Sequence, residues 1–170
     1  MAKLVKGPFS IKWGENAVLD VSEVGFNYDQ TTNDYETVDG RTLHTEGAIT
    51  ATIELTLLST DVDALKTIFP QYYVAPGGTL STGETVASDA EGAIDIVAAS
   101  CDTSDTNYPL DIISCNGEVT RLVNAKTRLS GINLENNSLR TVTVTFTGEP
   151  AQGQGIVQFF ENGKITPVES

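Results

Sequence analysis

The sequence predicts a mostly β protein: an antiparallel sandwich or barrel with one short α-helix packed on it and a long projecting hairpin. Two alternating stretches carry this prediction. Residues 46–59, EGAITATIELTLLS, place Ile and Leu on one face of a pleated strand and Thr and Glu on the other. Residues 141–147, TVTVTFT, repeat the pattern with Val and Phe opposite Thr. Together they indicate a sheet with one face on a core and a threonine-rich face toward water.

The composition agrees with strands and turns. The 170 residues are the length of one domain, and we expect a single domain over residues 1–170. Aromatic residues make up only 7% of the chain, which disfavours a sugar-stacking site. The net charge is −13, and affinity for phosphate groups comes mainly from Lys and Arg. We therefore expect no unassisted binding to DNA, RNA or an anionic membrane surface.

The N-terminal residues predict a soluble protein with an arm. MAKLVKGPFSIKW carries lysines without the apolar run of a signal peptide, and no stretch reaches the ~18 apolar residues of a membrane span. In such a protein Cys101 and Cys115 are expected to be free thiols. Residues 1–16 follow neither a helical nor a strand period, so we expect an ordered or partner-bound arm. Trp13, the only tryptophan, is either a core residue or an anchor in a neighbouring molecule.

Residues 18–24, VLDVSEV, predict a strand, and the polar segment 25–46 predicts the projecting hairpin. The hairpin arms flank Asp39-Gly40, a dipeptide suited to a two-residue type I′ turn, in which both positions need positive φ. The segment is too polar to bury much, which predicts a role at a surface.

A short helix follows the central strand. Thr60 or Asp61 can cap a helix over 62–69, where apolar residues recur at helical spacing, and Pro70 ends it. About two turns of helix are not stable alone, so its apolar stripe must pack on the sheet.

The rest of the chain predicts loops and three more hairpins. Residues 71–92 and 101–109 are expected to be loops, and 93–99 a strand. The hairpins pair strands 110–115 with 118–123, 129–135 with 139–147, and 158–161 with 164–168. Asn116-Gly117 and Asn162-Gly163 mark two of the turns, and Pro167 keeps the last strand at an edge. Hairpins and a single helix favour a sandwich or barrel.

No motif predicts catalysis or a cofactor. His44 is the only histidine, which excludes a metal site of several imidazoles, and no nucleotide-binding glycine loop occurs. Asp102, Asp105 and Asn107 offer oxygens to Ca²⁺, but the loop lacks the Gly and Glu of an EF-hand. We expect no enzyme activity, no cofactor and no metal.

The order of features resembles the tail tube protein, or major tail protein, of long-tailed bacteriophages, a relative of contractile-tail and type VI secretion tube proteins. The resemblance spans most of the chain: an N-terminal arm, VLDVSEV, a hairpin with VDGRT, the strand AITATIELTL, the helix DVDALKTIF and the strand TVTVTFTGEP. In that family six subunits join their sheets into a ring, and rings stack into a hollow tube through which DNA passes.

The resemblance implies a structural virion protein, located in the tail and assembled in the host cytoplasm, whose partners are further copies and other tail proteins. It implies that the threonine-rich face lines an acidic lumen that DNA crosses without specific binding. The lumen-facing candidates are Thr50, Thr52, Glu54, Thr56, Thr141, Thr143 and Thr145. It also implies that the arm and hairpin lie between subunits. The inter-subunit candidates are Trp13, Phe26, Tyr28, Tyr35, Arg41 and His44.

Two other classes of function stay open on the sequence alone. A monomeric β-sandwich binding or capsid-decoration module would recognise a carbohydrate or protein through the loops at 71–92 or 101–109. An enzyme would need a carboxylate pair in a cleft, which is defined by distance in space. In both cases the threonine-rich face is an ordinary hydrated sheet surface.

Overall fold

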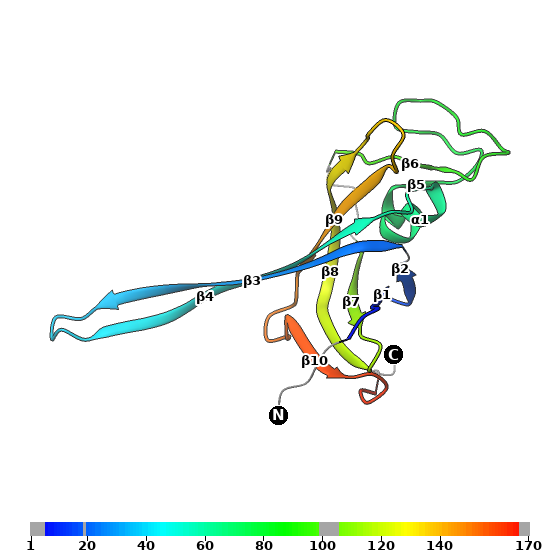
Figure 1. The fold of residues 1–170 in the computed structure, drawn as a ribbon. Helices are drawn as coiled ribbons and strands as arrows, with labels where there is room; N and C mark the ends of the chain where they lie inside the picture. Colours follow the sequence, from blue (N-terminus) through cyan, green and yellow to red (C-terminus); the bar gives the residue numbers. More distant parts are fainter. Residues whose placement is uncertain (1–5, 19, 99–105, 167–170) are drawn as a thin grey trace.

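The computed structural model describes residues 6–18, 20–98 and 106–166. Its main strands are β1 (Ser10–Trp13), β2 (Asn16–Val18), β3 (Val21–Glu36), β4 (Thr42–Leu57), β7 (Asn107–Ile113), β8 (Glu118–Asn133), β9 (Thr141–Gly148) and β10 (Val157–Glu161). They form one antiparallel sheet in the order β2-β1-β7-β8-β9-β4-β3, with β10 also on β8 (Figure 1). Helix α1 (Val62–Ile68), the 3₁₀ turn η1 (Pro70–Tyr72) and a small sheet of β5 (Tyr73–Val74) and β6 (Ala93–Ile94) complete the fold. The predicted mostly β fold, with a short helix and a long projecting hairpin, is confirmed.

The core lies on one face of the main sheet. Cross-strand pairs of β4 and β9 that face it are Ile53 with Phe146, Leu55 with Val144 and Leu57 with Val142. All six side chains are buried. Burying a side chain of this size contributes about 1.5–3 kcal/mol relative to leaving it in water.

Helix α1 covers this core, as its apolar spacing predicts. The Asp61 carboxylate accepts a hydrogen bond from the Ala64 backbone N at 3.0 Å, which caps the first turn. The last helical residue is Ile68, and Pro70 begins the 3₁₀ turn. Ile68 and Phe69 are each 1% exposed, so the end of the helix is part of the core.

The N-terminal segment joins the sheet from Ser10 onward and is not a free arm there. β1 pairs with both β2 and β7. Trp13 is 0% exposed, and its Nε1 donates a hydrogen bond to the Ala125 carbonyl O at 3.2 Å. The rings of Tyr108 and Phe146 meet it edge-on. The prediction that Trp13 anchors in a neighbouring subunit is therefore wrong, because the pleat of β1 directs the indole into the core of its own chain.

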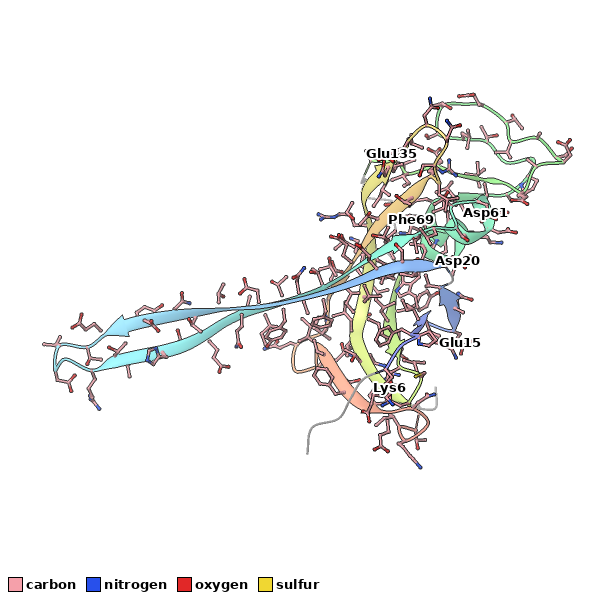
Figure 2. The ribbon with its side chains drawn as sticks, in the orientation of Figure 1. Lys6, Glu15, Asp20, Asp61, Phe69 and Glu135 are labelled. Carbon is pink, nitrogen blue, oxygen red and sulfur yellow. The ribbon has the colours of Figure 1, made fainter. Side chains whose placement is uncertain are left out.

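The predicted strand over 18–24 is interrupted. β2 ends at Val18, β3 begins at Val21, and Asp20 between them has a left-handed φ of 56°. Because β2 and β3 lie at opposite ends of the strand order, the chain crosses here from one sheet edge to the other. The Asp20 carboxylate accepts a hydrogen bond from the Ser59 hydroxyl, and the Asp20 carbonyl O accepts one from the Leu58 N at 2.8 Å. Figure 2 places Asp20 beside Asp61 at the start of α1.

The hairpin turns are not the predicted type I′ turns. At the tip of the β3–β4 hairpin, the Gly40 N donates to the Thr37 O at 3.0 Å. Gly40 has a φ of 82°, whereas Asp39 is not among the described residues with positive φ. Gly117 closes the β7–β8 turn in the same way onto Ser114, with a φ of 88°. Each glycine is therefore the fourth residue of its turn. A turn of this kind needs a positive φ at that residue only, whereas a type I′ turn needs it at two.

Several strand limits also differ from those predicted. The predicted strands 118–123 and 129–135 are parts of one strand, β8, which ends at Asn133 and has a positive φ of 53° at Asn124. The register of β8 shifts by one residue around Asn124, which forms a bulge. On one of its edges β8 pairs with β10 before this bulge and with β9 after the bulge. In contrast, only Ala93–Ile94 of the predicted strand 93–99 is a strand. Residues 164–166 form no strand, and residues 167–168 lie outside the described residues, so β10 finds its partner in β8.

The hairpin of β3 and β4 leaves the body of the protein as a two-stranded ribbon, residues 28–36 and 42–51 (Figure 1). β4 pairs with β9 only from Thr52 onward. Within the ribbon, Gly47 and Ala48 form a bulge opposite Thr31. A Cβ atom on Gly47 would collide with the Thr31 hydroxyl and lie 2.9 Å from the Thr31 carbonyl O. The bulge therefore requires glycine at this position.

We expect Gly47→Ala to weaken the ribbon by about 1–3 kcal/mol, because the new methyl group has no room beside the Thr31 backbone. Hydrogen exchange of the ribbon amides is the measurement, since the ribbon can open without global unfolding. Gly25→Ala in β3 is the matched control: its Cβ would meet nothing within 4 Å, so ribbon protection should stay or rise. Equal protection in the two variants would contradict the bulge geometry.

We expect Trp13→Ala to lower the free energy of unfolding by about 3–5 kcal/mol, because it empties a fully buried site. Trp13→Phe should cost less, since an aromatic ring remains and only the indole hydrogen bond and some volume are lost. Urea denaturation followed by circular dichroism checks this order, because both variants lack the tryptophan fluorophore. A Trp13→Ala variant as stable as the wild type would show that the indole is not a core residue.

Candidate assembly interface

The structure gathers the predicted lumen candidates on one face of β4 and β9, opposite the core; we call it the threonine face. Its cross-strand pairs are Thr52 with Thr147, Glu54 with Thr145, and Thr56 with Thr143. Thr50 and Thr141 continue the two strands on the same side. Thr145 is 9% exposed, while Glu54 beside it is exposed. Hydroxyl groups therefore cover the middle of this face.

The strands on either side add charges that sequence reasoning missed. The register places Glu23 and Asp29 of β3 beside Thr56 and Thr50, on the threonine face. On the other side, Lys126 and Arg128 of β8 lie beside β9 on the same face. The bulges of β8 break its alternation, so only the pairing with β9 reveals where these two cations lie. The face therefore is not uniformly acidic.

The inner face of β3 carries an exposed apolar stripe next to the core. Val24, Phe26 and Tyr28 are 39%, 38% and 51% exposed, and Ile49 of β4 beside them is 39% exposed. Figure 2 shows the side chains of the ribbon standing clear of the rest of the chain. A two-stranded ribbon alone is marginally stable in water, so its apolar side chains need a partner surface. Tyr28 begins the ribbon and Phe26 lies two residues before it, and both side chains are exposed enough for a second molecule to reach them.

The other hairpin candidates lie farther out on the ribbon. Tyr35 is an odd number of residues from Phe26 and Tyr28 along β3, so it lies on the opposite ribbon face. The Gly47 bulge shifts the alternation of β4 and brings Leu43, which pairs with Tyr35, onto that face too. Both side chains are more than half exposed. His44 contacts the Asp34 carboxylate across the two strands.

Arg41 lies at the tip of the ribbon, where its Nε forms an ion pair with Asp39 at 2.9 Å. The pKa of the Asp39 carboxyl is lowered, chiefly because the Thr37 hydroxyl donates a hydrogen bond to it, with a contribution from Arg41. These contacts order the turn itself, and the structure does not bring the tip together with the other candidate residues.

Apart from the short strands β2 and β10, two strand edges beside the threonine face have no partner among the described residues. β3 pairs only with β4, so its outer edge is open. β7 pairs with β8 no farther than Lys126, so β8 from Arg128 to Asn133 pairs with β9 alone. Strand edges of this kind readily take up another strand.

The loops offer less chemistry. The loop over 75–92 is tied to the body by the Asp95 carboxylate, which accepts the Ser81 N–H at 2.8 Å, and this bond lowers the Asp95 pKa. The calcium candidates Asp102 and Asp105 and the thiol of Cys101 lie outside the described residues, while Cys115 is exposed. Within the described ranges, no group of three His, Cys, Asp or Glu side chains is placed to hold a metal ion. No helix there is long and apolar enough to cross a membrane.

No family model and no curated protein matches the sequence. Solved structures do match its fold. The sheath/tube terminator of an extracellular contractile injection system (PVC) has a TM-score of 0.52 at 12% identity, over 94% of this chain and 98% of that one. The tube-terminating cap of the anti-feeding prophage has a TM-score of 0.52 at 11% identity, over 95% and 96%. A chain in the virion of the native gene transfer agent has a TM-score of 0.50 at 11% identity, over 89% and 95%.

These likenesses cover nearly the whole length of the chains compared, at identities that establish the fold alone. The chain therefore has the fold of the phage tail tube-like proteins, the family that its order of elements resembles.

Proposed function

We propose that the chain is a structural subunit of a virion tail, which self-assembles into rings that stack into a tube for the passage of DNA. The observation that carries the proposal is the bare threonine face between two open strand edges, on β3 and on β8. The tail-tube-like fold supports the same function.

The directions of the strands allow a ring to close. β3, β4, β9 and β8 alternate in direction, so β8 runs antiparallel to β3. A copy rotated about a common axis keeps its strand directions and brings its β3 edge antiparallel to the β8 edge of its neighbour. Such a head-to-tail contact closes into a ring in which the β3 edge and the β8 edge of every copy are paired.

The threonine face is the one that can line the lumen. Helix α1 and strand β1 contribute Ile68 and Trp13 to the core, so the body of the subunit covers the opposite face. Six copies of four strands make a barrel of about 24 strands, wider than the 16–18-stranded barrels that leave a water-filled channel. Thr hydroxyls and the carboxylates of Glu23, Asp29 and Glu54 would hydrate this wall and repel phosphate. Other tail proteins would bind the ends of the tube, in a virion assembled in the host cytoplasm.

A terminal ring is the second candidate function. Two of the solved structures with this fold are described as tube-terminating proteins. A terminator would form one ring that does not stack on further copies of itself. Electron microscopy distinguishes the two functions, since a tube subunit gives extended tubes and a terminator gives single rings.

The wild-type protein should form rings or tubes at high concentration, seen by negative-stain electron microscopy and by light scattering. The double variant Phe26→Asp, Tyr28→Asp should remain monomeric, because it places two carboxylates on the apolar stripe that a neighbouring copy would cover. Neither side chain is a buried core residue, at 38% and 51% exposed, so circular dichroism should show that the monomer remains folded.

Ile165→Asp is the control for that experiment, since Ile165 is 52% exposed and lies outside the ribbon. It should assemble as the wild type does. A wild-type protein that stays monomeric at every concentration would instead favour the monomeric binding module.

Tubes assembled in the presence of short DNA should not retain it after sedimentation. Thr52→Lys with Thr143→Lys should produce retention that falls steeply with salt, because cations in the lumen would hold phosphates. Thr82→Lys with Ser88→Lys adds the same charge to the loop over 75–92 and should not. Equal retention by both double variants would place the threonine face outside the lumen.

A further inference from the structure

The charges on the threonine face are sorted by strand. The carboxylates of this face stand on β3 and β4, toward the β3 edge, and its cations stand on β8: Glu23, Asp29 and Glu54 on the one side, Lys126 and Arg128 on the other. Strand β9 between them contributes only threonines. Each subunit thus carries an acidic border and a basic border on the same face.

One row of residues, which lie opposite each other across the four strands, shows the distance between the acidic and the basic border. Along this row lie Gly25 of β3, Glu54 of β4, Thr145 of β9 and Arg128 of β8. Glu54 and Arg128 are two strand spacings apart, about 9–10 Å, with the Thr145 side chain between them. Among the described residues no ion pair joins them.

The same row is open on its other side. Gly25 ends it at the β3 edge, and a Cβ added there would meet nothing within 4 Å. Glu23, two residues before Gly25, projects on the same face, and Glu54 lies directly across the ladder. The glycine is therefore the floor of a notch with a carboxylate on two sides. A cation arriving from beyond the β3 edge reaches Glu54 without a side chain in its way.

We propose that Arg128 of one copy enters this notch of the next copy and forms an ion pair with its Glu54, close to its Glu23. The occupant is a second copy of this chain, because its β8 edge from Arg128 onward has no partner among the described residues, runs antiparallel to β3 and carries the complementary charge on the same face. The inference rests on the proposed function and adds what sets the order and register of neighbouring subunits. Across this contact, Glu54 and the Arg128 of the neighbouring copy are two strand spacings apart, as Glu54 and Arg128 are within one chain. Gly25 lies between them instead of Thr145, so no side chain separates the two charges.

The pairing has a consequence for the lumen. It neutralises Arg128 at each contact between subunits, so this cation is not left to hold the phosphates of passing DNA. It also makes the contact directional, since an acidic border meets only a basic one and like borders repel.

Charge reversal tests the pairing. Arg128→Glu alone and Glu54→Arg alone should each raise the critical concentration for assembly about tenfold, because each places like charges at every contact. Sedimentation gives this concentration, and circular dichroism confirms that each variant is folded. Lys164→Glu, with the same change in net charge as Arg128→Glu but outside the four strands, is the control and should assemble as the wild type does.

An equal mixture of Arg128→Glu and Glu54→Arg is the decisive test of the pairing. In an alternating ring, the carboxylate introduced at position 128 of one variant would meet the guanidinium introduced at position 54 of the other. At the next contact the unchanged Arg128 would meet the unchanged Glu54, so assembly should return to within about threefold of the wild type.

Two results separate the pairing from the proposed function. The pairing is wrong if neither single reversal raises the critical concentration above that of Lys164→Glu, or if the mixture fails to assemble while the wild type assembles. Either result leaves the proposed tube function intact. If the wild type never assembles, the proposed function is wrong, and the pairing, which rests on it, is wrong too.

Discussion

The pairing of β4 with β9 is the constraint on which the rest of the structure depends. Its register sets Ile53, Leu55 and Leu57 against the apolar side chains of β9, and in the same step sets Thr against Thr on the other side. Because side chains alternate strictly along a strand, a slip of one residue would move every apolar side chain into water. Helix α1 and strand β1 can then pack on one face only, and the opposite face is left bare.

Three irregular positions in the sheet each change the direction, the pairing or the alternation of a strand. The left-handed Asp20 carries the chain from one edge of the sheet to the other, and the bulge at Asn124 lets β8 exchange β10 for β9. The bulge at Gly47 changes the alternation of β4, so that Leu43 lies on the same ribbon face as Tyr35, opposite to Tyr28. One continuous hairpin can therefore present apolar side chains to two different surfaces.

Open edges and exposed apolar residues are costly for a protein that works alone, since both invite aggregation. Here they occur together with charges of opposite sign on the two borders of one face. In a head-to-tail ring the same features satisfy one another: each edge gains a strand, and each basic border meets an acidic one. The ribbon, whose strands pair only with each other within the described part of the chain, gains a surface to pack on.

Local pattern sufficed to predict the threonine face, the capped helix over 62–69 and the projecting hairpin, because alternation, a capping carboxylate and polar composition act over a few residues. It left open whether Trp13 is a core residue or an anchor, because the burial of Trp13 depends on Ala125 and Phe146, more than a hundred residues away. Nor did it find Arg128, since the bulges of β8 change the face of each side chain that follows. The amino-acid sequence by itself thus determined which strands have one wet face, because that is a property of neighbours in the chain. Only the tertiary structure decided which strands meet, which edges stay open and which charges share a face, because register joins residues distant in sequence.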